Sequence, residues 1–210
     1  MIDLLEDQEF KRLESKYPFL SHAREHFSGL EKERFVIVDI ETTGLDFSTN
    51  EIIEVAAMKV ENKEIIDVFN SLIDPNSEIS PEITRITGIT QDMVEGHPKI
   101  SDISSKILEF FGDAILIAHN SSFDIPFLKH HLKKNFNNQI VCTLKASRYL
   151  LPNLANHKLH TVAAHFGVTA QNRHRALGDV ETTLQVWLNM IPLLRDKGIY
   201  AKQDLQKIPG

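Results

Sequence analysis

Three groups of polar residues in this 210-residue sequence have side chains that can act together on a charged substrate. Asp39 and Glu41 stand two apart at the end of the run FVIVDI, so their side chains point to the same face of a strand. Asp124 and Asp179 each stand at the expected start of a helix, and His174 lies in the polar loop before Asp179. Carboxylates at the end of a buried strand are costly unless a metal ion or another cation compensates them. Their hard oxygen atoms suit Mg²⁺ or Mn²⁺.

Each group also has an ordinary structural interpretation. Asp39 and Glu41 can be exposed at a strand end or can cap the turn that follows them. Asp124 and Asp179 can complement the helix macrodipole, since both fall in a first helical turn. Asn120 can be a turn residue or a helix N-cap. A histidine alone in a loop is usually solvated, so the residues taken singly leave both interpretations open.

Five apolar segments predict the strands that must position these side chains. They cover residues 35–40, 51–60, 63–73, 114–119 and 139–142, with a hairpin turn at Glu61-Asn62. Helices are expected as short pieces in 77–94, interrupted at Pro81 and Gly88, and over 101–111, 122–134, 143–150, 158–166 and 178–194, where Pro192 ends or kinks the last. A meander of strands followed by alternating helices and strands predicts an α/β fold, with a mixed sheet flanked by helices.

The two ends of the sequence differ from the middle. Residues 1–34 are densely charged and poor in β-branched residues, which indicates a helical N-terminal extension that serves packing or partner docking. Residues 35–195 form one expected domain, and residues 196–210 a short C-terminal tail. His160 and His165 fall on a helix with apolar neighbours, so partial burial is expected for both.

Composition limits the class of protein. Hydrophobic residues make up 42% and charged residues 25%, as in a soluble globular chain. The acidic start lacks the features of a signal peptide, and the short apolar runs are too short to cross a bilayer, so a cytoplasmic location is expected. The single cysteine, Cys142, excludes an intramolecular disulfide and a multi-cysteine zinc site. The net charge of −6 argues against salt-driven duplex binding as the main activity, but setting four metal-binding carboxylates aside leaves −2.

Taken together, three ordered motifs resemble a known family. DIETTGL (39–45), AHNSSFD (118–124) and HRALGD (174–179) are similar in order and spacing to the motifs of the DEDDh 3′→5′ exonucleases, and to the proofreading (epsilon) subunit type of bacterial DNA polymerase III. The resemblance spans about 35–195 and includes ITGITQDMV (86–94). One departure is Cys142, where many relatives carry an aspartate; no catalytic role belongs to that position.

The resemblance implies a ribonuclease H-like fold and two-metal phosphodiester hydrolysis with Mg²⁺ or Mn²⁺. It implies that Asp39 bridges both ions, that Glu41 and Asp179 complete the nucleophile-side site, and that Asp124 helps to position the second ion. His174, whose unperturbed pKa is near 6.5, would be the general base. The same resemblance implies that the terminal nucleotide contacts Thr42, Thr43, Gly44, Leu45, Asn120 and Phe123.

The motifs leave the substrate open. The favoured interpretation is removal of nucleotides from single-stranded 3′ ends, with DNA preferred and RNA trimming or oligonucleotide degradation as the alternative. A catalytically silent recruiting module would be expected to have lost one of the four acids or the histidine, and all are present. A phosphodiesterase acting on small nucleotides is a third possibility. The absence of a clamp-binding peptide after 195 favours a free-standing nuclease or docking through the N-terminal extension.

Overall fold

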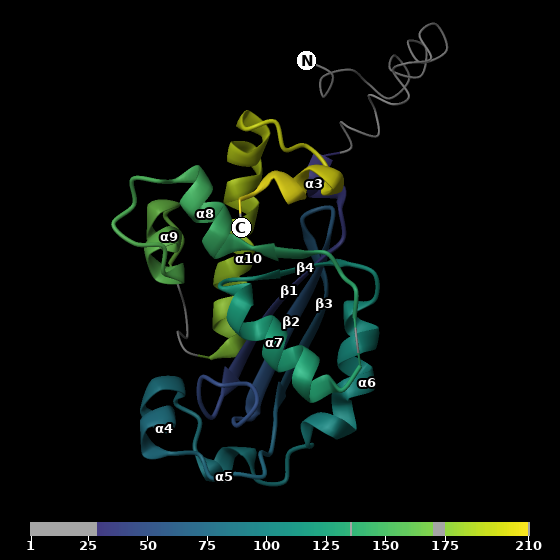
Figure 1. Cartoon of the computed structure of the whole chain (residues 1–210), viewed down its shortest axis with the longest axis vertical. Coiled ribbons are helices and arrows are strands. Elements are labelled where there is room, and N and C mark those ends of the chain that lie inside the picture. Colours follow the sequence, from purple (N-terminus) through teal and green to yellow (C-terminus); the bar gives the residue numbers. More distant parts are fainter. Residues whose placement is uncertain (1–28, 135, 170–174, 210) are drawn as a thin grey trace, which may run out of the picture.

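The computed structural model describes residues 29–134, 136–169 and 175–209, and its centre is a five-stranded sheet in the order β3-β2-β1-β4-β5 (Figure 1). β1 pairs antiparallel with β2 and parallel with β4, so the sheet is mixed as expected. The strands are β1 (Phe35–Thr42), β2 (Ile52–Glu61), β3 (Glu64–Leu72), β4 (Ile115–Ala118) and β5 (Ile140–Cys142). The helices are α3 (Gly29–Lys32), α4 (Pro81–Thr87), α5 (Gln91–Val94), α6 (Ile100–Phe111), α7 (Ser121–Leu132), α8 (Thr143–Leu150), α9 (Leu159–His165), α10 (Ala176–Asp196) and the 3₁₀ helix η2 (Lys202–Lys207).

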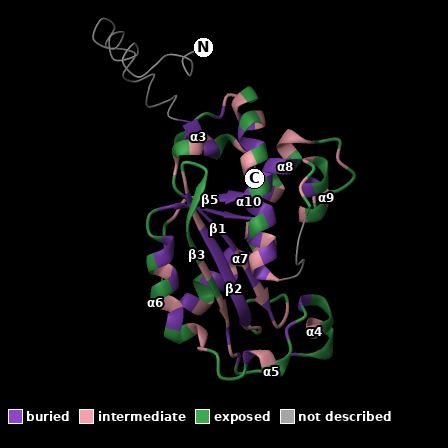
Figure 2. Ribbon diagram, turned by 180° about the vertical axis from the view of Figure 1, so that it is seen from behind, coloured by how far each residue is buried: buried purple, intermediate pink, exposed green. Residues whose placement is uncertain are grey.

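The central strands of the sheet are buried between two helical layers because they are apolar on both faces, whereas the edge strand β3 is largely exposed. Successive side chains of β1 alternate between two cores: Phe35 and Ile37 pack with α10, whereas Val36 and Val38 pack with α6 and α7. On the α10 side, Trp187 meets Phe35 edge to face at 5.5 Å between ring centroids. Figure 2 shows the buried residues concentrated in the sheet and on the inner faces of these helices. This packing fixes the ends of β1 and α10 relative to each other.

The segment after α10 is packed against the domain. Ile199 and Leu205 are buried in the same core as Trp187. The backbone N–H of Leu30 donates to the carbonyl of Tyr200 at 3.0 Å, which joins α3 to this segment. Residues 1–28, on which most of the expected helical extension falls, lie outside the described part of the chain. No helix in the described ranges is long and apolar enough to span a membrane.

The structure corrects three local predictions. The hairpin turn is centred on Asn62 and Lys63, which both have positive φ, one residue later than expected. Helix α10 continues through Pro192 to Asp196 because Ile191 and Leu194 are buried on either side of it. His160 and His165 are exposed rather than partly buried, since α9 places only Val162 and Ala163 in the core.

Candidate active site

The structure brings three of the four predicted acids into one group. Asp39 and Glu41 point from the end of β1 to the face that α10 covers, and Asp179 lies in the first turn of α10. Each of the three offers a carboxylate oxygen, and these oxygens all lie within 4.8 Å of one another. All three residues are partly exposed, so a ligand can reach them from solvent. The packing of α10 on the sheet therefore joins residues that are 140 positions apart in the sequence.

Asp124 lies outside that group but interacts electrostatically with it. It sits in the first turn of α7 and is only 2% exposed. Burial raises the pKa of Asp124 to about 8, although hydrogen bonds from backbone N–H groups, including that of Ile40, lower it. The charge of Asp124 in turn raises the pKa of Asp39. All four predicted acids thus belong to one electrostatic cluster at the end of β1.

The cluster carries more negative charge than its surroundings compensate. Burial raises the pKa of Asp39 well above its usual range, and repulsion from Asp124, Glu41 and Asp179 adds to this. Burial, followed by repulsion from Asp179 and Glu54, raises the pKa of Glu41 to about 8, against the opposing effect of Arg175. A set of carboxylate oxygens at this separation has the chemistry that divalent cations prefer. The cluster can therefore bind metal, and a bound cation would relieve the repulsion.

The turn after β1 is held by a short network of hydrogen bonds. The Thr42 hydroxyl donates to the carbonyl of Gly44 at 2.6 Å. The backbone N–H of Thr43 donates to the carbonyl of Glu51 at 2.8 Å, and the Thr43 hydroxyl accepts from the backbone N–H of Glu51 at 2.9 Å. A β-carbon on Gly44 would lie 2.3 Å from Oδ1 of Asn50, so only glycine fits there without a shift. The turn is consequently rigid, and it presents Leu45, which is 87% exposed, to solvent.

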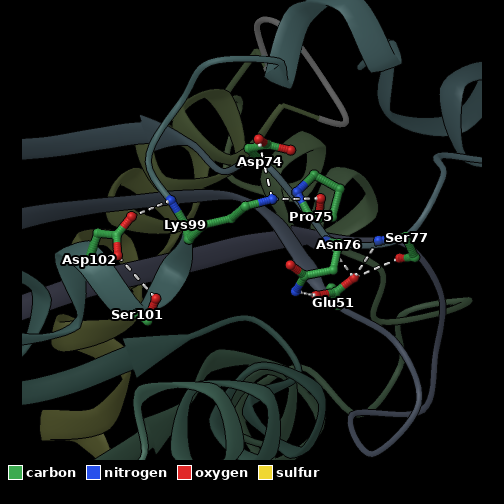
Figure 3. A network of polar contacts seen from close by, with 8 residues as sticks. All are labelled: Glu51, Asp74, Pro75, Asn76, Ser77, Lys99, Ser101 and Asp102. Carbon is green, nitrogen blue, oxygen red and sulfur yellow. Dashed lines mark hydrogen bonds and ion pairs between the residues drawn. The ribbon is translucent and has the colours of Figure 1, made fainter.

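Glu51 anchors this turn to the loop after β3 (Figure 3). Its carboxylate accepts hydrogen bonds from the backbone N–H groups of Asn76 and Ser77, both at 2.9 Å, and from the side chains of the same residues. Burial alone would raise the pKa of Glu51, but these hydrogen bonds together lower it. Lys99 holds the start of the loop through the carbonyl of Pro75 and the carboxylate of Asp74. The predicted nucleotide-binding turn is thus supported by charged groups on two other segments.

The remaining predicted substrate residues lie at the start of α7. Asn120 adopts a left-handed conformation before the helix, with φ 69°, and its side-chain oxygen accepts a hydrogen bond from Ser122. Phe123 is half-buried and packs on Phe127, with 5.0 Å between ring centroids. Phe47, which the sequence did not single out, packs on the same Phe127 and is 42% exposed. His174 lies outside the described residues, directly before Arg175.

An ion pair that the sequence did not reveal fixes the start of α10. Glu54 is 1% exposed on β2 and accepts two hydrogen bonds from Arg175, at 3.1 and 2.8 Å, and one from the backbone N–H of Ala176 at 3.0 Å. These bonds tie β2 to the helix that carries Asp179. The sequence signal that could have predicted a buried ion pair is the single acid in the apolar run IIEVAA, since glutamate is almost never fully buried unless paired.

Comparison with known proteins gives consistent matches over most of the chain. The profile of the exonuclease family RNase_T matches residues 36–187. The chain is 40% identical over 177 residues to a DNA polymerase III of the PolC type from Caldanaerobacter subterraneus, and 39% identical over 186 residues to that from Bacillus subtilis. These matches cover 83% and 86% of the chain but 13% of each relative, so the chain spans a small part of those proteins' length.

Solved structures extend the comparison to the fold. Exonuclease X, in complex with 5′ overhanging duplex DNA, superposes with a TM-score of 0.68 at 27% identity, covering 84% of this chain and 99% of that one. The nuclease domain of 3′hExo, a DEDDh family member bound to rAMP, gives a TM-score of 0.69 over 80% of this chain and 94% of that one. Because the two sequences are only 20% identical, this similarity supports the shared ribonuclease H-like fold and no more.

Proposed function

Because the chain belongs to the RNase_T exonuclease family, we propose that it is a metal-dependent 3′→5′ exonuclease that acts on single-stranded 3′ ends, with DNA preferred over RNA. The observation that carries the proposal is the group of Asp39, Glu41 and Asp179, whose carboxylate oxygens lie within 4.8 Å of one another. The similarity to PolC-type polymerases and to a DNA-bound exonuclease supports DNA. A bacterial polymerase or repair partner and a cytoplasmic location are part of the same proposal.

In this proposal, Asp39, Glu41, Asp124 and Asp179 would hold two divalent ions, Mg²⁺ or Mn²⁺. When bound, such ions lower the pKa of water and stabilise the departing 3′-oxygen. Asp39 would serve both ions, Glu41 and Asp179 the ion that activates water, and Asp124 the ion on the leaving-group side. His174 accepts the proton of the attacking water. The rigid turn with Thr42, Thr43, Gly44 and Leu45 holds the terminal nucleotide together with Asn120 and Phe123, and Leu45 packs against its base.

The test is hydrolysis of a mononucleotide ester and of a 5′-labelled single strand by the wild-type chain and the Asp39→Asn variant. We expect hydrolysis that requires Mg²⁺ or Mn²⁺, is inhibited by EDTA and is lost in the variant. Direct titration with Mn²⁺ provides a readout independent of turnover, and Asp39→Asn should weaken binding at least about tenfold. A strand labelled at its 3′ end that keeps its label while it becomes shorter from the 5′ end would contradict the proposed polarity.

A further inference from the structure

A hollow opens beside the acid cluster, at Asp179. Its volume is about 790 Å³, which is within the range of ligand sites in proteins. Asp179 and Asn120 line one part of it, and Arg148 and Lys158 also line it. None of the turn residues 42–45 is among the described residues of its wall. The hollow therefore connects the predicted reaction centre with two cations that the reaction itself does not use.

The charge of the hollow suits an anion that extends beyond the cluster. Arg148, at the end of α8, and Lys158, directly before α9, are both exposed. Neither makes an ion pair with an acid in the described part of the chain, unlike Arg34, Arg175 or Arg195. Two cations facing an open hollow without acidic partners are available to phosphate groups. Besides Asp179, these two cations are the formally charged side chains among the described lining residues, and both suit contacts to backbone phosphates.

The loop that carries Lys158 is fixed by buried polar contacts. Nε2 of His119 lies 3.0 Å from the carbonyl of His157, so this nitrogen must carry the proton and donate. Nδ1 of His119 then accepts from the hydroxyl of Thr143 at 2.9 Å. Burial lowers the pKa of His119 to about 4, which agrees with this neutral form. Nδ1 of His157 lies 3.0 Å from the Ser147 hydroxyl on α8. His119, directly after β4, thus holds the α8–α9 loop in place, and Asn120 lines the same hollow as Lys158.

We infer that this hollow binds the phosphodiester backbone of a single strand on the 5′ side of the bond that is cleaved, with Arg148 and Lys158 contacting its phosphates. The inference rests on the proposed function, because the cluster at one end of the hollow sets where the reacting phosphate lies. The ligand class is the phosphodiester backbone shared by DNA and RNA. The hollow accordingly adds affinity for longer strands without reading their sequence.

The test compares Arg148→Ala/Lys158→Ala with a control, Lys106→Ala/Lys134→Ala, that removes the same charge elsewhere. Lys106 and Lys134 are exposed near α6, on the opposite face of the sheet. Binding of fluorescein-labelled dT12 and rU12 is measured by anisotropy in Ca²⁺, and hydrolysis is measured with dT12 and with p-nitrophenyl thymidine 5′-monophosphate, which has no upstream nucleotide.

We expect the Arg148/Lys158 variant to bind both 12-mers at least about tenfold more weakly, the loss typical of charge-assisted hydrogen bonds. Its slope of log affinity against log salt should fall by about 1.4, from two lost phosphate contacts on a single strand. Hydrolysis of the small ester should be unchanged, and the control variant should match the wild type. All four variant positions are exposed, so melting temperatures should also be unchanged.

Three outcomes would overturn the inference. Equal binding by the Arg148/Lys158 variant and the control would show that the strand does not follow the hollow, while wild-type cleavage would leave the proposed function intact. An equal loss on the small ester would place the two cations at the reacting phosphate instead. A wild-type chain that neither binds nor cleaves either polymer would overturn the proposed function and this inference together.

Discussion

Replacing Glu54 with alanine removes the buried carboxylate that joins β2 to the start of α10. Three hydrogen bonds are lost, and the N–H of Ala176, a residue with no exposed surface, is left without a partner. Breaking a buried ion pair costs about 3–5 kcal/mol. The Arg175 side chain is 38% exposed and can regain water, which places the loss near the lower limit. Relief of the repulsion between Glu54 and the acids Asp39 and Glu41 reduces it further. We expect a loss of about 2–3 kcal/mol in the metal-free protein.

The assay is urea denaturation in EDTA combined with steady-state kinetics. The double variant Glu54→Ala/Arg175→Ala completes a thermodynamic cycle, and a coupling free energy of about 1.5 kcal/mol or more is expected for a charged, hydrogen-bonded pair. Because Glu54 fixes the helix that carries Asp179, kcat/KM should fall at least about tenfold, as expected when a catalytic group is misplaced.

The control is Arg195→Ala, which breaks an ion pair with Glu31 at the other end of α10. It should lower stability by about 1 kcal/mol and leave kcat unchanged, since that end of the helix does not carry the acid cluster. A free energy of unfolding for Glu54→Ala within about 0.5 kcal/mol of the wild type would show that the buried carboxylate does not stabilise the fold. Additive effects in the cycle would show that Glu54 and Arg175 are not coupled. An activity loss of the same size in Arg195→Ala would show that activity follows stability alone.

Three further predictions concern the cluster and its surroundings. His174→Ala should lower kcat by a factor of about 10²–10⁴ and flatten the pH–rate profile on its acid side, whereas an unchanged profile would identify another base. Metal-free stability should fall as pH rises from about 4.5 to about 8, because the raised pKa of Glu41 makes the folded state hold protons that the unfolded state has lost. Glu41→Gln should reduce this slope in denaturation measurements, and a stability that rises with pH relative to the variant would contradict the assignment. Gly44→Ala should raise KM and lower the free energy of unfolding by about 1–3 kcal/mol, since its β-carbon displaces Asn50, and full activity would show that the turn can adapt.

The sequence predicted the sheet because the strand patterns and the buried faces agree. FVIVDI is apolar on both sides and lies in the middle of the sheet, where both faces are covered. Asp39 and Glu41 were predicted to share a face because side chains alternate along a strand. Their proximity to Asp179 was implied only by the resemblance, since it depends on how α10 packs on the sheet.

What the sequence did not reveal are contacts between distant segments. Glu54 and Arg175 are 121 residues apart, and nothing local in either segment indicates that they pair. The hollow beside Arg148 and Lys158 depends on the path of the α8–α9 loop, which His119 fixes through a carbonyl 38 residues away. Pro192 was expected to end or kink α10, but tertiary packing around Ile191 and Leu194 outweighs the lost backbone hydrogen bond.

The most direct measurement is digestion of matched 5′-labelled single-stranded DNA and RNA with Mg²⁺, Mn²⁺ or EDTA, by the wild-type chain and by Asp39→Ala. We expect a metal-dependent ladder that shortens from the 3′ end, faster on DNA, and its complete loss in a variant that retains the wild-type circular dichroism spectrum. Full activity of Asp39→Ala, or equal activity in EDTA, would contradict the assignment of the carboxylate cluster as the metal-dependent active site.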